Sequence, residues 1–306
     1  MNSSTTWPDL PRAITSFGAA ALGDAVFVYG GHHGKAHHYY DEGQSGELLR
    51  LNVRDAAGWD VVSVGPRLQG LAMVAHQERL YRLGGFEARN TVDQEQNLWS
   101  IDHFACFDPA AGVWRDLPPM PEPRSSFDAA VLEGVLYVVG GWKLCGDREA
   151  SWCETACACD LNSAAPVWRE IPPPPFQRRA LSVAALDGRI YVLGGMQPDG
   201  AVSRATAVFD PASRQWSGGP DLPGEEMEAF GTACCSLEGR LYVSTSSGRV
   251  LRLAPSGDAW EEVATLGDGR FFHRMTPIRD ARLLLIGGAS MQRGKYKSVE
   301  SVRIEG

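Results

Sequence analysis

The stretch Leu136-Tyr137-Val138-Val139-Gly140-Gly141-Trp142 recurs with small variations along the whole chain. Its run of apolar residues predicts a strand that is covered on both faces, and the two glycines that follow allow a turn with positive φ. Other copies end in the glycine pairs 30–31, 84–85, 194–195 and 287–288, and a worn copy, Leu241-Tyr242-Val243-Ser244-Thr245-Ser246, fills the remaining interval. Six copies in 306 residues give a period of about 51 residues, which indicates a repeat architecture.

A tryptophan follows the glycine pair in five of the six units, and it marks a further strand. These tryptophans are Trp59, Trp114, Trp168, Trp216 and Trp260. In several units a turn of the Asp-Pro type precedes the tryptophan, as in Phe107-Asp108-Pro109. Each unit is therefore predicted to contain four antiparallel strands.

Together, the recurring tyrosine, glycine pair and tryptophan resemble the kelch-repeat family over nearly the whole chain. The resemblance implies an all-β fold, a six-bladed kelch-type β-propeller that forms a single domain over residues 1–306. Only 18 residues follow Gly288, so Trp7-Pro8-Asp9-Leu10, which is similar to Trp114-Arg115-Asp116-Leu117, is expected to supply the outermost strand of the last blade. This closure would remove an exposed sheet edge.

Composition narrows the classes of partner. A net charge of −8 argues against a general nucleic-acid partner. The N-terminal residues lack the pattern of a secretion signal, and no run approaches 18 apolar residues, so neither secretion nor a membrane span is supported. Seven cysteines, an odd number, fit a reducing cytoplasm better than a disulfide framework. We expect a cytoplasmic monomer.

A second recurring feature lies in the links between units. An arginine precedes the glycine pair by 16 to 18 residues in five units, and Glu228 stands near the same place in the fifth. The five are Arg12, Arg67, Arg124, Arg178 and Arg270. Strand alternation places these links and the long loops of the first three units on one face. The arginines are therefore expected to line the mouth of the central channel, with His32 and Trp142 beside them.

Two interpretations of this arginine ring remain open. The guanidinium groups can cap backbone carbonyls, or they can hold an anion by forked hydrogen bonds. In kelch substrate adaptors the resembling arginines bind acidic peptides, and in other family members they hold sugars or carboxylates. The resemblance therefore implies a binding module for an acidic protein, an acidic peptide or a small anion.

An enzyme is the alternative prediction, acting on a carboxylated or sugar-like molecule in the manner of a mutarotase or epimerase. Glu228, a carboxylate among arginines, should have a lowered pKa and is a candidate base. His273, close to Arg270, is the second candidate for proton transfer. A salt bridge for Glu228 and simple packing for His273 are the structural alternatives.

No cofactor is predicted, although a divalent metal is conceivable at the histidine-rich loop. His32, His33 and His37 are weak candidate ligands, with Asp41 or Glu42 as a third donor, and a solvated polar loop is the alternative. Cys157 and Cys159 are two residues apart in a predicted third strand, which favours packing in the core over zinc binding.

Known kelch enzymes offer limited analogies. Galactose oxidase has a kelch propeller whose copper ligands lie in distant loops, whereas most histidines here share one loop. Plant nitrile-specifier proteins bind iron through Glu-x-x-x-Asp-x-x-x-His, and none of the seven histidines has this pattern before it. The bacterial sialic acid mutarotase is similar in blade number, without a shared motif.

Overall fold

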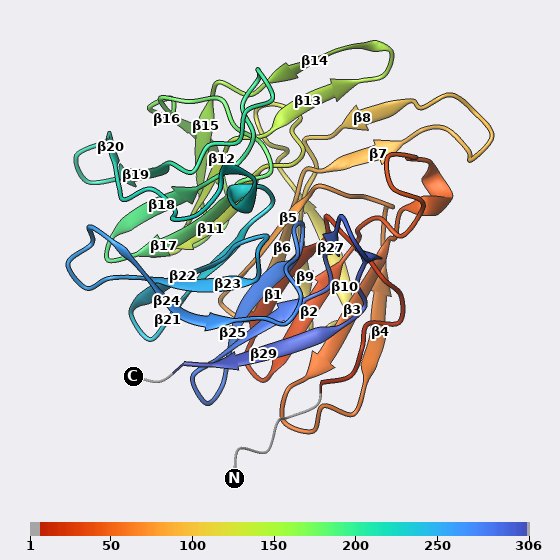
Figure 1. The fold of residues 1–306 in the computed structure, drawn as a ribbon. Coiled ribbons are helices and arrows are strands. Elements are labelled where there is room, and N and C mark those ends of the chain that lie inside the picture. The colour runs from red at the N-terminus through yellow and green to blue at the C-terminus, as the bar shows by residue number, and fades with distance from the viewer. Residues whose placement is uncertain (1–6, 305–306) are drawn as a thin grey trace.

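The computed structural model describes residues 7–304, in which nearly all regular structure is β-strand. Six antiparallel sheets follow one another along the chain, and we number them blades one to six (Figure 1). Blade one contains β1 (Gly18–Leu22), β2 (Ala25–Tyr29), β3 (Glu47–Asn52) and β4 (Trp59–Val64). Blade two contains β5 (Ala72–His76), β6 (Arg79–Leu83), β9 (Phe104–Asp108) and β10 (Val113–Leu117). Blade three contains β11 (Asp128–Leu132), β12 (Val135–Val139), β15 (Ala156–Asp160) and β16 (Trp168–Ile171).

The second half of the ring repeats this plan. Blade four contains β17 (Ser182–Leu186), β18 (Arg189–Leu193), β19 (Thr206–Asp210) and β20 (Gln215–Gly218). Blade five contains β21 (Ala233–Leu237), β22 (Arg240–Ser244), β23 (Arg249–Leu253) and β24 (Trp260–Thr265). Blade six contains β25 (Arg274–Ile278), β26 (Arg282–Ile286) and β29 (Val299–Arg303).

The first strands of the blades meet around the centre of the molecule (Figure 1). Each contacts the next in a closed circle, from β1 through β5, β11, β17, β21 and β25 back to β1. This is the propeller arrangement that the sequence predicts.

Apolar side chains fill the space between neighbouring blades. One cluster joins Leu83 and Phe104 of blade two to Leu136, Val138 and Cys157 of blade three, and all five are buried. A large apolar side chain that is fully buried in this way contributes roughly 1.5–3 kcal/mol. The second strand of each blade is covered on both faces, which explains its unbroken apolar run.

The glycine pair ends the second strand because no other residue fits there. Gly140 and Gly141 have φ of +76° and +97°. A Cβ on Gly141 would lie 2.7 Å from the carbonyl oxygen of Ser125 and 2.8 Å from Cβ of Phe127. The pair therefore lets the link to the next blade approach the end of the strand.

The N-terminal segment does not form the strand that the sequence predicts at Trp7–Leu10. Instead, the carbonyl of Pro8 accepts the indole N–H of Trp59 at 3.0 Å. The prolines that follow the outermost strands accept the equivalent bonds, namely Pro118, Pro172 and Pro220. Trp7–Leu10 is thus the link that comes after the position of an outermost strand, and residues 1–6 lie outside the described residues.

The same segment still ties the two ends of the described chain together. The amide of Leu10 donates to the carbonyl of Lys297 at 2.8 Å. Trp7 and Leu10 are buried in a cluster with Leu284 and Val299 of blade six and with residues of blade one. The link between these two blades is therefore packed like the others, although its residues are not in a strand.

Long loops of blades two and three build a further sheet that projects from the ring (Figure 1). Its strands are β7 (Phe86–Ala88), β8 (Leu98–Ser100), β13 (Trp142–Cys145) and β14 (Arg148–Trp152). Blade six has only the short hairpin of β27 (Ala289–Ser290) and β28 (Gly294–Lys295). The only described helices are the single turns η1 (Asp41–Gly43) and η2 (Glu226–Ala229), so no described helix is long enough to span a bilayer.

Candidate functional site

A backbone hydrogen bond that recurs between blades locates the expected arginine ring. The amide of the second glycine donates to one carbonyl in the following link, at 2.8–3.0 Å. The acceptors are Ile14, Leu68, Arg124, Arg178 and Ala229, each 16 residues before the first glycine of its own blade or before Thr245. Arg12, Arg67 and Glu228 stand one or two residues earlier. They do not occupy the equivalent position, so the expected ring of five arginines and one glutamate is wrong.

The three remaining arginines are structural. Arg124, Arg178 and Arg270 are 1%, 2% and 0% exposed. In each, Nη1 donates to the carbonyl of the first glycine in its own blade and to a second carbonyl before the third strand, at 2.7–3.5 Å. The capping alternative is therefore the one that the structure supports, and these side chains do not reach a ligand at the mouth. Burial lowers the pKa of Arg178 to about 10.

Arg12 and Arg67 lie on the exposed rim of the mouth and already have carboxylate partners. Arg12 contacts Glu47 at 2.9 Å, and Arg67 forms an ion pair with Asp41. Arg12 also approaches Nε2 of His33 at 3.5 Å. Burial, followed by the charges of Arg12 and of Lys295 from blade six, lowers the pKa of His33.

The histidine-rich loop does not assemble a metal site. His32 is 2% exposed, and its ring packs against Tyr39 with centroids 4.9 Å apart. Burial and, secondarily, Lys295 lower the pKa of His32 to about 4. Within residues 7–304, no three histidine, cysteine, aspartate or glutamate side chains come together as a ligand set. The proposed grouping of His32, His33 and His37 is therefore not formed.

Both candidates for proton transfer are engaged elsewhere. Glu228 accepts from Nη2 of Arg249 at 2.7 Å and from Oγ of Ser247 at 2.5 Å. Burial raises the pKa of Glu228, but these two hydrogen bonds outweigh it, so the pKa is lowered. The salt-bridge alternative for Glu228 is thus the one that the structure shows.

His273 fills a core position, where its Cβ packs against Gly288. Phe17, Leu71, Phe127 and Leu181 make the same contact with the second glycine in other blades. Burial, followed by the charges of Arg270 and Arg274, lowers the pKa of His273 to about 3. His273 is 2% exposed and neutral near pH 7, so it cannot exchange protons at the mouth.

Six backbone hydrogen bonds close the centre of the ring. Each link supplies one amide that donates to the equivalent carbonyl of a neighbouring link, at 2.7–3.2 Å. The six residues, all with φ between +53° and +64°, are Ser16, Gly70, Ser126, Ala180, Gly231 and Phe272. This closed ring holds the residues just before it at fixed places around the mouth.

Those preceding residues divide the mouth into two halves. Thr15, Gln69 and Ser125 are buried beneath the long loops of blades one to three. His32, Phe86 and Trp142 from these loops each form a β-bridge with one of them. The equivalent residues of blades four to six, Arg179, Phe230 and Phe271, stay partly exposed because the loops there are short. With Phe272, we call these residues the open half of the mouth.

Arg179 is the distinctive charge of the open half. Its guanidinium lies 4.1 Å from the ring centre of Trp142 and 5.7 Å from that of Trp152. Its only hydrogen-bond acceptor in the described chain is the sulfur of Met196, at 3.1 Å. No carboxylate among residues 7–304 lies within 4.0 Å of it. Burial lowers its pKa, and the nearby hydroxyl of Tyr39 partly offsets this effect.

Below the mouth, an ion pair crosses the central channel. Nη1 of Arg274 in blade six lies 2.8 Å from Oδ1 of Asp128 in blade three. The same guanidinium donates to the carbonyls of Phe17 and Leu71, in the links to blades one and two. Asp128 also accepts the amide of Val183 in blade four, at 3.0 Å. The mouth therefore has a floor.

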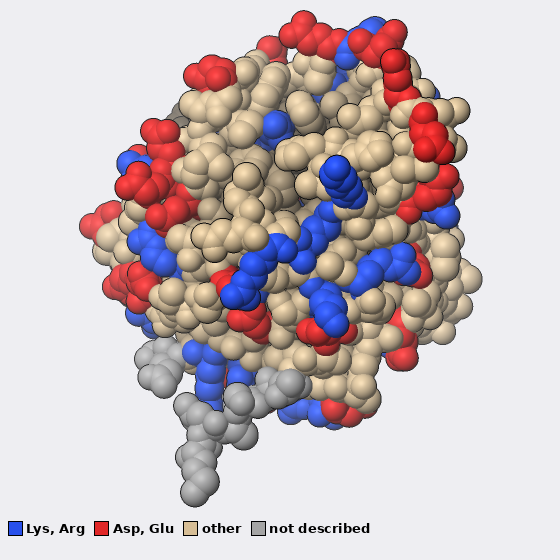
Figure 2. All heavy atoms as spheres, turned by 45° about the vertical axis from the view of Figure 1, so that its right-hand side comes forward, with Lys and Arg blue, Asp and Glu red and all other residues tan. Residues whose placement is uncertain are grey.

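Charge is unevenly distributed around the molecule. Figure 2 shows one side on which acidic side chains gather along the margins and basic side chains cross the middle. The net charge of −8 is thus compatible with a local basic surface. Near the mouth, Arg12, Arg67 and Lys295 all contribute positive charge around His33.

The cysteines are core residues, as their alternation predicts. Cys157 and Cys159 lie opposite Val138 and Leu136, just as Ala105 and Phe107 lie opposite Arg82 and Leu80 in blade two. All seven cysteines fall within the described residues and are free thiols. Burial raises the pKa of Cys157 to about 12, which makes it unreactive at neutral pH.

Comparison with known proteins places this geometry in a family. Residues 177–223 match the model of the Kelch motif. The chain is 27% identical to mouse Kelch-like protein 35 over 240 residues, which cover 78% of this chain and 36% of the relative. It is also 24% identical to alpha-scruin of Limulus polyphemus over 233 residues, covering 72% of this chain and 25% of the relative. This chain is a kelch-repeat protein. It spans well under half the length of these curated relatives.

A solved structure confirms the fold of the kelch chain. The structure of YjhT superimposes with a TM-score of 0.78 and covers 98% of this chain and 97% of its own. At 14% sequence identity, the likeness shows the all-β propeller fold and does not extend to a ligand.

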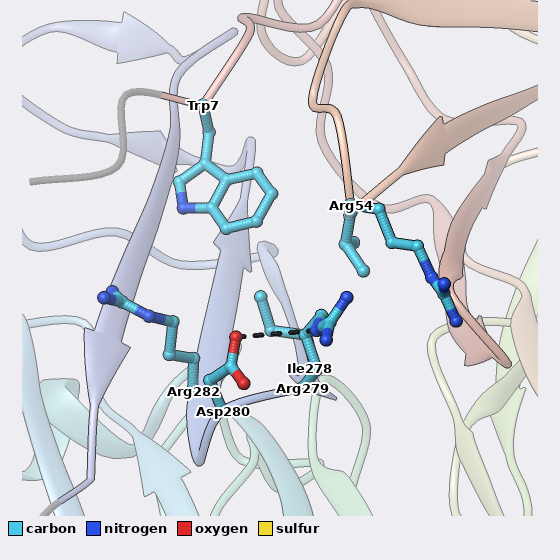
Figure 3. A pocket seen from close by; sticks show the side chains of 7 residues that line it. Trp7, Arg54, Ile278, Arg279, Asp280 and Arg282 are labelled. Atoms are coloured by element: carbon cyan, nitrogen blue, oxygen red, sulfur yellow. Dashed lines mark ion pairs between the residues drawn. The ribbon is translucent and has the colours of Figure 1, made fainter.

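A small pocket lies away from the mouth of the kelch propeller (Figure 3). Trp7, Arg54, Ile278 and Arg282 line it together with the ion pair of Arg279 and Asp280. Arg279 and Asp280 form the turn between β25 and β26, at the opposite end of these strands from the glycine pair. The pocket therefore faces away from the open half of the mouth, and we assign no function to it.

Trp142 lies at the mouth, where the sequence places it, but Arg179, Phe230 and Phe271 are absent from the sequence-based set of site residues. The constant 16-residue spacing to the first glycine is the signal that could have placed them. It identifies Arg178 as the buried member of the pair Arg178-Arg179 and leaves Arg179 as the residue at the mouth.

Proposed function

We propose that this kelch propeller is a protein-binding module whose partner contacts the open half of the mouth. The observation that carries the proposal is Arg179, a partly buried cation that stacks on Trp142 and has no carboxylate partner in the described chain. Aromatic residues, methionine and arginine are the types enriched at protein interfaces, and they concentrate in binding hot spots. The open half and its wall consist largely of these types.

The partner segment is acidic in this proposal. Arg179 can pair with a carboxylate at a modest desolvation cost, because it is already stripped of most of its water. Arg12, Arg67 and Lys295 on the rim add positive potential that would steer an acidic segment toward the mouth. With Glu228 and His273 engaged elsewhere, no described pair of proton-transfer residues favours the enzyme alternative.

Site-specific photo-crosslinking tests the proposal. The photoreactive residue p-benzoylphenylalanine replaces Trp152 at the mouth in one variant and Val167, which is 72% exposed on an outer edge, in another. In a lysate of the producing cells, the variant at 152 should capture a protein, and adding Arg179→Gln should reduce the yield. Capture at 167 alone, or equal capture at both positions, would contradict a binding face at the mouth.

A further inference from the structure

Three phenylalanines form an aromatic platform in the open half of the mouth. The ring centroids of Phe230, Phe271 and Phe272 lie 5.0–6.0 Å apart, with two of the three pairs nearly perpendicular. All three side chains are partly exposed. Because edge-to-face contacts favour fixed geometry, the platform is a preformed apolar surface.

Phe272 occupies a strained position that the other blades give to small residues. Its φ is +53°, in the left-handed region, where a bulky side chain is rarely found. The five equivalent residues are Ser16, Gly70, Ser126, Ala180 and Gly231. A Cβ on Gly231 would lie 3.0 Å from the ring of Phe272, so glycine at 231 makes room for this ring. Strain that is maintained at an exposed aromatic residue points to a role in function.

The platform and Arg179 are neighbours on the closed backbone ring. The amide of Gly231 donates to Ala180, directly after Arg179, at 3.0 Å. The amide of Phe272 donates to Gly231 at 2.9 Å. An apolar surface and a cation without a carboxylate partner in the described chain therefore lie side by side, with Trp142 behind the cation.

We propose that the open half of the mouth recognises a partner segment in which a large apolar side chain lies close to a carboxylate. The apolar side chain seats on the platform of Phe230, Phe271 and Phe272, and the carboxylate pairs with Arg179. The inference rests on the proposed binding function and adds the chemistry of the partner. The projecting loops of blades one to three would hold the segment from the other side.

Selection from a displayed library of random dodecapeptides tests this specificity with the full chain. The wild type should enrich peptides with an aromatic or large aliphatic residue within three positions of Asp or Glu. Arg179→Gln should lose the acidic preference and keep the apolar one. The double variant Phe230→Ser with Phe271→Ser should do the reverse, provided that its circular dichroism matches the wild type.

A second measurement does not depend on the folding of any variant. An enriched peptide and two matched peptides, with the apolar residue changed to Ala or the acid to its amide, are compared by fluorescence anisotropy on the wild type. Each change should weaken binding by about tenfold or more, which corresponds to about 1.4 kcal/mol. Equal affinities would overturn the proposal.

Other outcomes separate this inference from the binding function. Capture by the crosslinker at position 152 with no apolar–acidic preference leaves the binding module in place and overturns the specificity. A library that yields no enriched peptide also counts against it. So does stabilisation of the chain by glucuronate, a sugar acid, with no peptide bound, because that result would assign the platform to a sugar ring.

Discussion

Arg178 and Arg179 are adjacent in the sequence and have unlike environments. Arg178 is 2% exposed and donates to the carbonyls of Gly194 and Ala205 at 3.0 and 2.7 Å. Arg179 points to the mouth and stacks on Trp142. At the scale of single residues, the structural and functional arginines are therefore distinguished by one step along the chain.

His273 should make stability depend on pH. Its pKa is lowered to about 3 in the folded protein by burial and by Arg270 and Arg274, whereas an unfolded histidine titrates near 6.5. Above about pH 6.5 both states are neutral, and as pH falls from there toward 3 only the unfolded state gains the proton. The free energy of unfolding should thus fall by up to about 1.4 kcal/mol per pH unit in this window.

His273→Phe, which copies Phe17 and Phe127 at the equivalent position, should flatten this part of the profile. Urea unfolding at several pH values between 4 and 7 measures the effect. An unchanged slope in the variant would contradict a buried neutral His273. His32, which is also buried, contributes in the same direction and remains in both proteins.

At the scale of elements, the strand and its glycine pair could be predicted from the sequence, and the links could not. The alternation that put Cys157 and Cys159 in a core strand is confirmed by their register. Strands follow from local patterns because both faces of each are buried. The arginine register failed because a link of variable length separates units, and one residue of error exchanges a buried side chain for one at the mouth.

The N-terminal link shows the same limit. Trp7–Leu10 resembles an outermost strand, yet the hydrogen bond from Trp59 to Pro8 places it after one. A shared Trp-x-x-Leu pattern does not fix register, because only cross-blade contacts reveal it. The open half of the mouth was likewise invisible, since it depends on which loops cover which residues.

Gly141→Ala and Gly188→Ala should separate backbone strain from steric conflict. Gly188, in the turn of β17 and β18, has φ of +72°, and a Cβ added there would have no neighbouring atom within 4 Å. Its replacement should cost only the left-handed penalty of about 1–2 kcal/mol. Gly141 adds contacts at 2.7 and 2.8 Å with backbone and Cβ atoms, so its replacement should cost clearly more.

Equilibrium unfolding in urea compares the two variants with the wild type. Equal losses in the two would show that close packing at the glycine pair adds nothing to the backbone preference.

The whole molecule is held as a ring by contacts that cross its centre. Arg274 binds Asp128 on the opposite blade and the carbonyls of Phe17 and Leu71 between them. The six backbone hydrogen bonds above this ion pair close the same circle. A ring built in this way gains when all blades are present together, which favours cooperative unfolding.

Asp128→Ala should destabilise the whole ring. Removing one partner of a buried ion pair leaves an uncompensated charge and costs about 3–5 kcal/mol. Asp128→Ala combined with Arg274→Met should cost less than the sum of the two single changes, because the stranded charge is gone. A double-mutant cycle from urea unfolding measures this coupling, and additive losses would show that the pair does not interact.

The comparison of Arg178→Gln with Arg179→Gln tests the central claim most directly, with melting temperature and affinity for an enriched acidic peptide measured on both. Arg178→Gln removes the donor to two buried carbonyls, each worth about 1–3 kcal/mol. It should lower the melting temperature by at least about 4 °C and leave the folded protein's affinity unchanged. Arg179→Gln should keep the melting temperature and weaken binding about tenfold or more. The opposite pattern, with lost binding in Arg178→Gln and lost stability in Arg179→Gln, would contradict the account.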